Sequence, residues 1–226
     1  MADHAAHQPG AAGARADLTD ESAALLEAGR LLFAGECRFV YAAQRLDQLP
    51  PPTGPEVAFA GRSNVGKSSL LNALTGRRAL ARVSVTPGRT RQLNFFDLGG
   101  RLTLVDMPGY GYARASRDVK DDWQGLMFDY LRGRPTLRRV LLLLDARIEL
   151  KDADRQVMDL LDQAAVTFQL VLTKVDGVKP GAIERKLAEA NGIARMHAAA
   201  HPDVMRTSSE TGTGIPELRA EIAGLG

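Results

Sequence analysis

The chain has 226 residues, of which 45% are hydrophobic and 25% charged, and its formal net charge is +2. These values are ordinary for a globular protein with a buried core, and the charge alone does not indicate a nucleic-acid partner. The single cysteine, Cys37, excludes an intrachain disulfide and favours a reducing compartment. No apolar run approaches the ~18 residues that a membrane span needs, and no secretory signal begins the chain. We expect a cytoplasmic protein without a membrane segment.

The N-terminal residues 1–36 are expected to form an extension that precedes one domain at 37–226. Residues 1 to about 20 are rich in Ala, Gly and His and show little apolar periodicity, which predicts a mobile tail. Residues 22–33 can form a short amphipathic helix. Residues 39–41 can either pair as an edge strand or pack on the core.

Beyond Pro50, segments that predict strands alternate with segments that predict helices. We expect strands at 56–60, 92–98, 102–106, 140–144, 167–172 and 203–207. We expect helices at 69–74, 118–131, 152–165, 180–199 and 215–225, and Gly192 is a point where the fourth can be interrupted. Gly99 and Gly100 predict a hairpin turn that makes the two strands beside it antiparallel. This order predicts an α/β fold with three α/β/α layers and a mostly parallel six-stranded sheet that contains one antiparallel strand.

A phosphate-binding pattern, G-x-x-x-x-G-K-[ST], follows the first of these strands. It is formed by Gly61, Arg62, Ser63, Asn64, Val65, Gly66, Lys67 and Ser68. The two glycines allow the backbone to curl around a phosphate, Lys67 can contact β- and γ-phosphates, and Ser68 can offer a hydroxyl to Mg²⁺. A helix from Ser69 onward would direct its N-terminus at the phosphate. The strand and helix on either side favour a P-loop NTPase over a plain glycine-rich turn.

A D-x-x-G motif lies at the end of the strand predicted at 102–106. It consists of Asp106, Met107, Pro108 and Gly109. The Asp106 carboxylate can hold Mg²⁺ through a water, and the Gly109 N–H can donate to a γ-phosphate. A plain Pro-Gly turn would explain the loop but not the acid at the end of the strand.

An [NT]-K-x-D motif follows the strand predicted at 167–172. It consists of Thr173, Lys174, Val175 and Asp176. The Asp176 carboxylate can accept hydrogen bonds from N1–H and N2–H₂ of guanine, and the Lys174 stem can cover the base. Adenine lacks this pair of donors and would leave the carboxylate unpaired, so the motif predicts GTP over ATP. A surface turn that happens to contain Lys and Asp is the weaker interpretation.

Two further polar segments complete the predicted site. The segment after the last strand consists of Thr207, Ser208 and Ser209, and its backbone N–H groups can bond guanine O6. Thr90, in the loop after the first helix, can complete the Mg²⁺ shell beside Ser68. Thr86 is the alternative for that role.

The chain resembles the YihA/EngB family of bacterial GTPases in the stretches GRSNVGKSSLLNAL, TPGRTRQLNFF, LVDMPGYGYA and LVLTKVD. This family belongs to the TrmE-Era-EngA-EngB-septin-like P-loop GTPases, and the resemblance covers about residues 37–224. The family is associated with assembly of the large ribosomal subunit and with normal septation in cell division. The resemblance implies a GTP-hydrolysing switch whose partner is the large ribosomal subunit or its precursor, through rRNA and ribosomal proteins, and we expect a monomer.

Matched motif by motif, the resemblance places GTP or GDP on residues 61–69, 88–92, 106–109, 173–176 and 207–209. The second of these segments consists of Gly88, Arg89, Thr90, Arg91 and Gln92. The resemblance places Mg²⁺ on Ser68 and Thr90.

Hydrolysis is expected to depend on Lys67, Thr90, Gly109 and Asn64. Tyr110 stands where many small GTPases carry a water-orienting Gln, so we expect slow intrinsic turnover, roughly 10⁻⁴ to 10⁻² s⁻¹. Related GTPases that carry Asn at the place of Asn64 in the phosphate loop can bind K⁺ there, which suggests that K⁺ accelerates the reaction. An Asn64 that only stabilises the loop turn is equally favoured.

Basic residues are concentrated in two segments. Residues 62–96 contain seven Lys or Arg and no acid, and residues 131–144 contain four Arg and no acid. We favour an rRNA contact for the first segment and have no preference for the second. Two rival functions remain open: an ATP-using enzyme such as a kinase, against which Asp176 argues, and a nucleotide-stabilised scaffold at the division machinery.

Overall fold

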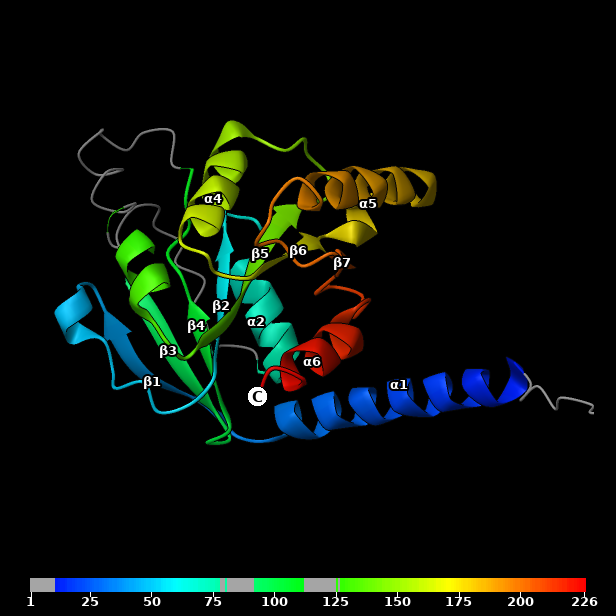
Figure 1. The fold of residues 1–226 in the computed structure, drawn as a ribbon, viewed down its shortest axis with the longest axis horizontal. Helices are drawn as coiled ribbons and strands as arrows, with labels where there is room; N and C mark the ends of the chain where they lie inside the picture. Colours follow the sequence, from blue (N-terminus) through cyan, green and yellow to red (C-terminus); the bar gives the residue numbers. More distant parts are fainter. Residues whose placement is uncertain (1–10, 78–79, 81–91, 112–124, 126) are drawn as a thin grey trace, which may run out of the picture.

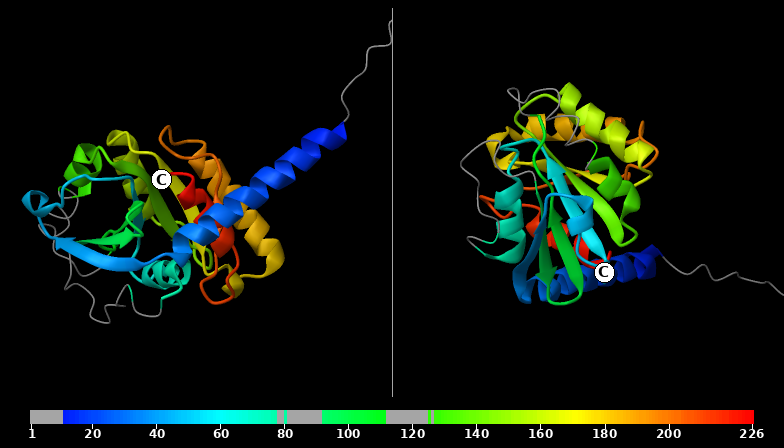
Figure 2. Two further views of the ribbon diagram at one scale, coloured as in Figure 1. Left: turned by 90° about the horizontal axis from the view of Figure 1, so that it is seen from below. Right: turned by 90° about the vertical axis from the view of Figure 1, so that its left-hand side faces the viewer.

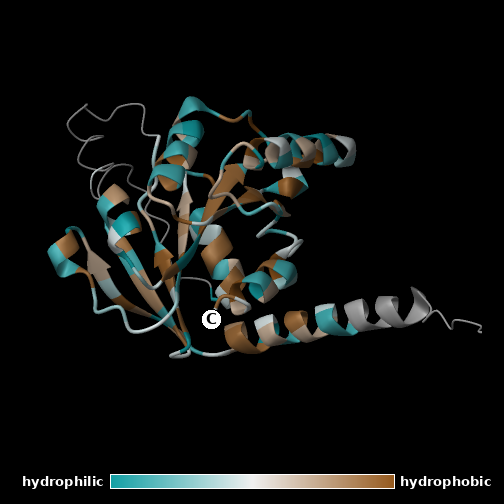
Figure 3. Cartoon of the chain, viewed as in Figure 1, coloured by the Kyte–Doolittle hydropathy of each residue, from teal (hydrophilic) through white to brown (hydrophobic). Residues whose placement is uncertain are grey.

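A computed structural model describes residues 11–77, 80, 92–111, 125 and 127–226, with residues 11–19 as backbone only. A sheet runs through the middle of the molecule and carries helices on both faces, which confirms the predicted three layers (Figure 1). Hydrophobic residues concentrate on the strands and on the helix surfaces that face them (Figure 3).

The sheet has seven strands in the order β1-β3-β4-β2-β5-β6-β7. They are β1 (Cys37–Ala43), β2 (Glu56–Gly61), β3 (Leu93–Leu98), β4 (Leu102–Asp106), β5 (Leu137–Asp145), β6 (Phe168–Thr173) and β7 (Met205–Arg206). Among the strands that the structure describes, only β3 runs against its neighbours β1 and β4, so the mostly parallel sheet with one antiparallel strand is confirmed. The expected count of six is one too low, because β1 joins the sheet at its edge.

The hairpin predicted at Gly99 and Gly100 joins β3 to β4. Both glycines have positive φ, 62° and 67°, as a tight turn between twisted antiparallel strands requires. The turn brings Asn94 opposite Asp106, so the start of β3 and the end of β4 lie at the same edge of the sheet.

Helices cover the two faces in separate groups (Figures 1 and 2). They are α1 (Ala11–Ala34), α2 (Lys67–Thr75), α4 (Asp152–Gln163), α5 (Pro180–Ala194) and α6 (Ile215–Ala223), with short turns η1 (Leu46–Gln48) and η2 (Val175–Gly177). One core cluster contains residues of α1, α2 and α6, and the other contains residues of α4, α5 and the helical segment 127–133. Helix α5 continues through Gly192, so the suggested interruption there is wrong.

A helix was predicted at 118–131, and its residues 118–124 and 126 lie outside the described part of the chain. Its described part, 127–133, is helical. Met127, Tyr130 and Leu131 of this segment are buried.

Helix α1 begins well before the expected residue 22, so a tail over all of residues 1–20 is not what the structure shows, although 1–10 lie outside its description. The helix extends past the rest of the molecule at its N-terminal end (Figure 2). Its last turns pack on α6: a Cβ added at Gly29 would lie 2.5 Å from the backbone nitrogen of Ala220. Leu32 and Phe33 are buried in the same cluster as α2 and α6. Among the helices that are described, none combines the length and the apolar character that crossing a membrane requires.

A buried polar network closes the amino-terminal end of the sheet. Arg134 donates to the Glu56 carboxylate through Nε at 2.9 Å and Nη2 at 2.5 Å, and its Nη1 donates to the Pro50 carbonyl at 2.7 Å. The Tyr130 hydroxyl donates to the same carboxylate at 3.2 Å. Burial first, and the neighbouring Glu56 second, raise the pKa of Tyr130 well above its usual range. The network ties the helical segment 127–133 to the first residue of β2.

The second basic segment, 131–144, is largely used inside the fold. Arg134 is in the buried network, and Arg139 pairs with Glu221 of α6. Only Arg132 and Arg138 are exposed. The segment therefore offers little basic surface to an RNA.

Candidate functional site

Four predicted motifs meet at the carboxyl-terminal edge of the parallel strands. Residues 61–69 follow β2, 106–109 follow β4, 173–176 follow β6 and 207–209 follow β7. Open α/β sheets bind ligands at this edge. Gln92 directly precedes the antiparallel β3 and so lies at the same edge, where its amide donates to Asn94 at 3.0 Å. Gly88, Arg89, Thr90, Arg91 and the alternative Thr86 lie outside the described residues.

The phosphate loop turns sharply between β2 and α2. Asn64 and Gly66 have left-handed backbone conformations, with φ of 66° and 106°. A Cβ added at Gly61 would lie 2.8 Å from the Val65 side chain, so only glycine permits this return of the loop. Helix α2 begins at Lys67, and the free N–H groups of its first turn, together with the helix dipole, favour an anion at the loop.

Lys67 and Asp106 form an ion pair between this loop and the D-x-x-G motif. Their side chains are only 13% and 12% exposed. Asp106 ends β4, which lies beside β2 and pairs Asp106 with Phe59. The contact places the predicted phosphate-binding cation beside the predicted metal-binding carboxylate.

The donor set fits a hydrated Mg²⁺ bound together with a phosphate. No group of three His, Cys, Asp or Glu in the described part of the chain could hold a metal by itself. Mg²⁺ usually keeps several waters and takes one or two protein oxygens along with phosphate oxygens. The Ser68 hydroxyl, next to Lys67, and the Asp106 carboxylate offer such oxygens.

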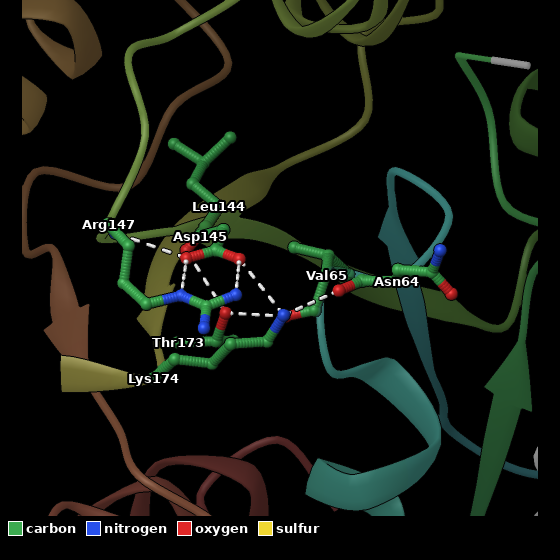
Figure 4. Close-up of polar contacts among 7 residues, drawn as sticks. All are labelled: Asn64, Val65, Leu144, Asp145, Arg147, Thr173 and Lys174. Atoms are coloured by element: carbon green, nitrogen blue, oxygen red, sulfur yellow. Dashed lines mark hydrogen bonds and ion pairs between the residues drawn. The ribbon is translucent and has the colours of Figure 1, made fainter. Parts of the chain in front are cut away.

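The [NT]-K-x-D motif is attached directly to the phosphate loop (Figure 4). Lys174 adopts a left-handed conformation, with φ of 57°, and its ammonium donates to the Asn64 carbonyl at 2.5 Å. The Thr173 hydroxyl donates to the Val65 carbonyl at 2.7 Å. These contacts join two motifs that are more than a hundred residues apart in the sequence.

Asp145 is a member of this cluster that sequence reasoning missed. Its carboxylate accepts from Lys174 Nζ at 2.9 Å and from Arg147 Nε and Nη2 at 3.0 and 2.9 Å (Figure 4). Burial alone would raise the pKa of Asp145, but the hydrogen bonds from Arg147 and Lys174 outweigh it and lower the pKa to about 2. The available signal was an acid that ends a strand, as Asp106 does.

Asp176 is held by the loop after β7. The Ser208 hydroxyl donates to Asp176 Oδ1 at 2.5 Å and accepts the Glu210 and Thr211 N–H groups at 3.2 and 3.1 Å. Ser208 is fully buried, whereas Asp176 is exposed. The buried hydroxyl therefore fixes the orientation of an accessible carboxylate.

The predicted backbone donors at 207–209 are mostly engaged within the protein. The N–H of Thr207 donates to the Leu172 carbonyl at 2.7 Å, and that of Ser208 donates to the Thr213 carbonyl at 2.9 Å. The N–H groups of Thr207 and Ser208 are therefore already used within the protein. Ser209 remains the candidate donor in this segment.

Tyr110 follows Gly109 and is 5% exposed. Its hydroxyl donates to Asp154 Oδ1 of α4 at 2.9 Å. Burial first, and then Asp154, raise the pKa of Tyr110 well above its usual range. The ring lies in the core, so it cannot orient a water as a Gln at this position would.

A pocket of about 240 Å³ borders the phosphate loop. Its walls include Arg62 and Val65, the segment 143–150 and Ile193 of α5, but not Lys67 or Asp176. Ser63 and Asn64 of the phosphate loop also line it, so the pocket adjoins the edge where the nucleotide motifs meet.

Comparisons with known proteins agree with this arrangement. Residues 56–174 match the family model described as 50S ribosome-binding GTPase. The chain is 68% identical over 206 residues to the probable GTP-binding protein EngB of Granulibacter bethesdensis, which covers 91% of this chain and 92% of that relative. It is 52% identical over 217 residues to the protein of the same name from Caulobacter vibrioides, covering 96% and 92%. A crystal structure of a probable EngB has a TM-score of 0.60 and 22% identity, covering 75% of this chain and 97% of that one, which supports the fold alone.

Proposed function

We propose, since the chain belongs to the EngB family of probable GTP-binding proteins within the ribosome-binding GTPases, that it binds GTP and GDP and hydrolyses GTP as a slow molecular switch. The switch would act in assembly of the large ribosomal subunit and thereby in normal cell division and septation. The observation that carries the proposal is the attachment of Lys174 to the Asn64 carbonyl, because it brings the base-recognition and phosphate motifs into one site.

The phosphates would be held by the N–H groups of residues 61–69 and by Lys67. Lys67 would then exchange its contact with Asp106 for the β- and γ-phosphates. Mg²⁺, held by Ser68 and by Thr90, would neutralise charge on the phosphates. Gly109 would donate its N–H to the γ-phosphate. Positioning and charge neutralisation supply most of the catalysis in phosphoryl transfer.

Base recognition is tested by Asp176→Asn. We expect the variant to lose GTP affinity by about tenfold or more, because each lost hydrogen bond to a charged group is worth roughly 1.5–3 kcal/mol, and to gain affinity for xanthosine triphosphate. Equilibrium binding of GTP, ATP and xanthosine triphosphate measures both changes. Asp159→Asn, on the exposed face of α4, is the matched control and should leave all three affinities unchanged. Unaltered GTP binding by Asp176→Asn would refute recognition of guanine by this carboxylate.

Activation of hydrolysis is tested by the monovalent cation. The Asn64 side chain is exposed and points away from Lys174 (Figure 4), which leaves it able to contact a cation beside the phosphates. We expect faster GTP turnover in KCl than in NaCl, and expect Asn64→Ala to remove the difference. Equal rates in the two salts would contradict a role for K⁺ and leave Asn64 as a turn residue.

The partner is tested by co-sedimentation with ribosomal particles in the presence of a GTP analogue or GDP. We expect analogue-dependent binding to large-subunit particles, weakened by salt and lost in Ser68→Ala. Salt sensitivity would follow from phosphate contacts of the basic segment 62–96. Binding in neither nucleotide state would contradict the assembly role and favour a scaffold at the division machinery.

A further inference from the structure

We propose that Tyr110 and Asp154 form a latch that positions the Gly109 peptide for the γ-phosphate, which makes Tyr110 a positioning residue for GTP recognition. The latch rests on the proposed function, since it acts on the GTP that this function assigns to the site. Tyr110, which stands where many small GTPases carry a water-orienting Gln, would then act by holding the Gly109 peptide in place.

The backbone of Tyr110 is bonded to both ends of the first turn of the phosphate loop. Its N–H donates to the Gly61 carbonyl at 3.2 Å, and its carbonyl accepts the Ser63 N–H at 3.1 Å. Arg62 and Tyr110 thereby form a parallel bridge that continues the edge of β2. The position of Tyr110 thus sets the spacing between the D-x-x-G motif and the phosphate loop.

Gly109 is pressed against the same turn. A Cβ added at Gly109 would lie 3.1 Å from the Ser63 hydroxyl oxygen and 3.2 Å from the Ser63 nitrogen. Little space exists in which the Gly109 peptide could shift toward the loop. Any rotation of the peptide must therefore move Tyr110 as well.

The side chain of Tyr110 fixes this arrangement from the far side. Its hydroxyl donates to Asp154 Oδ1 at 2.9 Å, while Asp154 Oδ2 accepts the Lys151 N–H at 2.9 Å at the start of α4. Asp154 is 3% exposed and lies in the first turn of α4, where the helix dipole favours a carboxylate. The latch therefore connects the Gly109 peptide to the rigid end of a helix.

The protein contains a second buried tyrosine–carboxylate pair that serves as a matched control. Tyr130 donates to Glu56 at 3.2 Å, and both residues are buried, but they lie at the opposite end of the sheet. Loss of the Tyr130 hydroxyl should reduce stability in the same way as loss of the Tyr110 hydroxyl. Only the Tyr110 pair touches the peptide proposed to meet the γ-phosphate.

The test compares Tyr110→Phe, Asp154→Ala, their double variant and Tyr130→Phe with the wild type. The affinities for GDP and for a non-hydrolysable GTP analogue are measured by equilibrium binding with Mg²⁺, and thermal midpoints are recorded. We expect each latch variant to weaken the analogue about tenfold, the equivalent of one hydrogen bond, while GDP affinity stays within about twofold. The double variant should resemble either single one, because both remove the same contact. Tyr130→Phe should lower the thermal midpoint and keep the ratio of the two affinities.

An unchanged ratio in both folded latch variants, or an equal loss for GDP and analogue, would overturn the latch and leave the contact purely structural. If Tyr110→Phe does not fold, the ratio of the two affinities measured for Asp154→Ala decides between a latch and a purely structural contact. A wild type that binds neither nucleotide would overturn the proposed function, and the latch with it. Failure of the latch alone is recognised by normal wild-type affinities.

Discussion

The two ends of the central sheet carry the same kinds of charged pair in different surroundings. At the amino end, the Arg134 and Glu56 side chains are 6% and 3% exposed and have several hydrogen bonds to one another. At the carboxyl end, Lys174 is 27% exposed where it meets Asp145, and Lys67 meets Asp106 at the site itself. The amino-end pair is buried in the core, whereas Lys174 is partly exposed and Lys67, at 13% exposure, lies between these two cases.

This difference in exposure separates folding from binding. Removing one partner of a buried ion pair strongly destabilises the folded protein, because the remaining charge stays desolvated. A partly exposed cation can instead exchange a carboxylate for a phosphate, since water and the new anion both compensate it. The comparison indicates that the ion pair at the amino end of the sheet stabilises the fold, whereas the lysines at the carboxyl end can exchange their carboxylate partners for a phosphate.

The largest effect is expected at the amino end, in Arg134→Ala. The change leaves Glu56 buried without its cation, so the free energy of unfolding should fall by about 3–5 kcal/mol. Urea denaturation measures the loss, and nucleotide affinity of the folded fraction should not change. Arg138→Ala, at an exposed arginine of β5, is the control and should stay within about 0.5 kcal/mol of wild type. If Arg134→Ala lost nucleotide affinity but kept its stability, the amino end of the sheet would serve binding and not folding, which would contradict the comparison of the two ends.

A smaller effect with a different character is expected for Thr173→Val at the carboxyl end. The variant keeps the side-chain shape but removes the hydroxyl that donates to Val65 and, at 3.2 Å, to the Leu144 carbonyl. We expect a loss of about 1–3 kcal/mol in stability, with a measurable loss of nucleotide affinity because the phosphate loop is no longer held. Denaturation and GDP titration test the two parts. Thr103→Val, in β4, provides the control. Full retention of nucleotide affinity by Thr173→Val would contradict the role of the Thr173–Val65 hydrogen bond in holding the phosphate loop.

The next effect depends on pH and concerns Asp145. Its pKa in the folded protein is lowered from 3.8 to about 2, so its ionised form stabilises the fold above about pH 4. This stabilisation should disappear as pH falls through the interval from 3.8 to about 2. Urea unfolding of wild type and Asp145→Asn over this range should show a difference that shrinks on acidification. A difference that grows on acidification would give the opposite sign and overturn the assignment.

The smallest effect is expected for Arg147→Ala. The Arg147 side chain is 49% exposed and pairs with Asp145 only two residues away. Exposed ion pairs contribute little to stability, and salt screens them. The difference in free energy of unfolding between the variant and the wild type should be smaller at high NaCl than at low NaCl. A loss as large as that of Arg134→Ala would show that the two ends are not distinguished by exposure.

Local patterns in the sequence were sufficient for most elements, because apolar runs and glycine turns report on adjacent residues. The apolar run at 140–144 predicted the centre of β5, and Gly99 with Gly100 predicted the hairpin. The edge strand β1 was left open because its register shifts between Phe39 and Tyr41, which breaks the alternation of buried and exposed residues. The early start of α1 was missed because its Ala- and Gly-rich first residues carry little apolar periodicity.

The phosphate loop and the D-x-x-G and [NT]-K-x-D motifs were recognisable in the sequence alone, since each is a short contiguous segment whose chemistry is local. By itself the sequence determined the fold class, the order of these motifs and their common edge of the sheet. Only the tertiary structure decided which side chains pair: Lys174 with Asp145, Tyr110 with Asp154, and Arg134 with Glu56. These partners are separated by 29, 44 and 78 residues. No periodicity or motif spans such distances, because the partners meet only when strands and helices pack and exclude water from the contact.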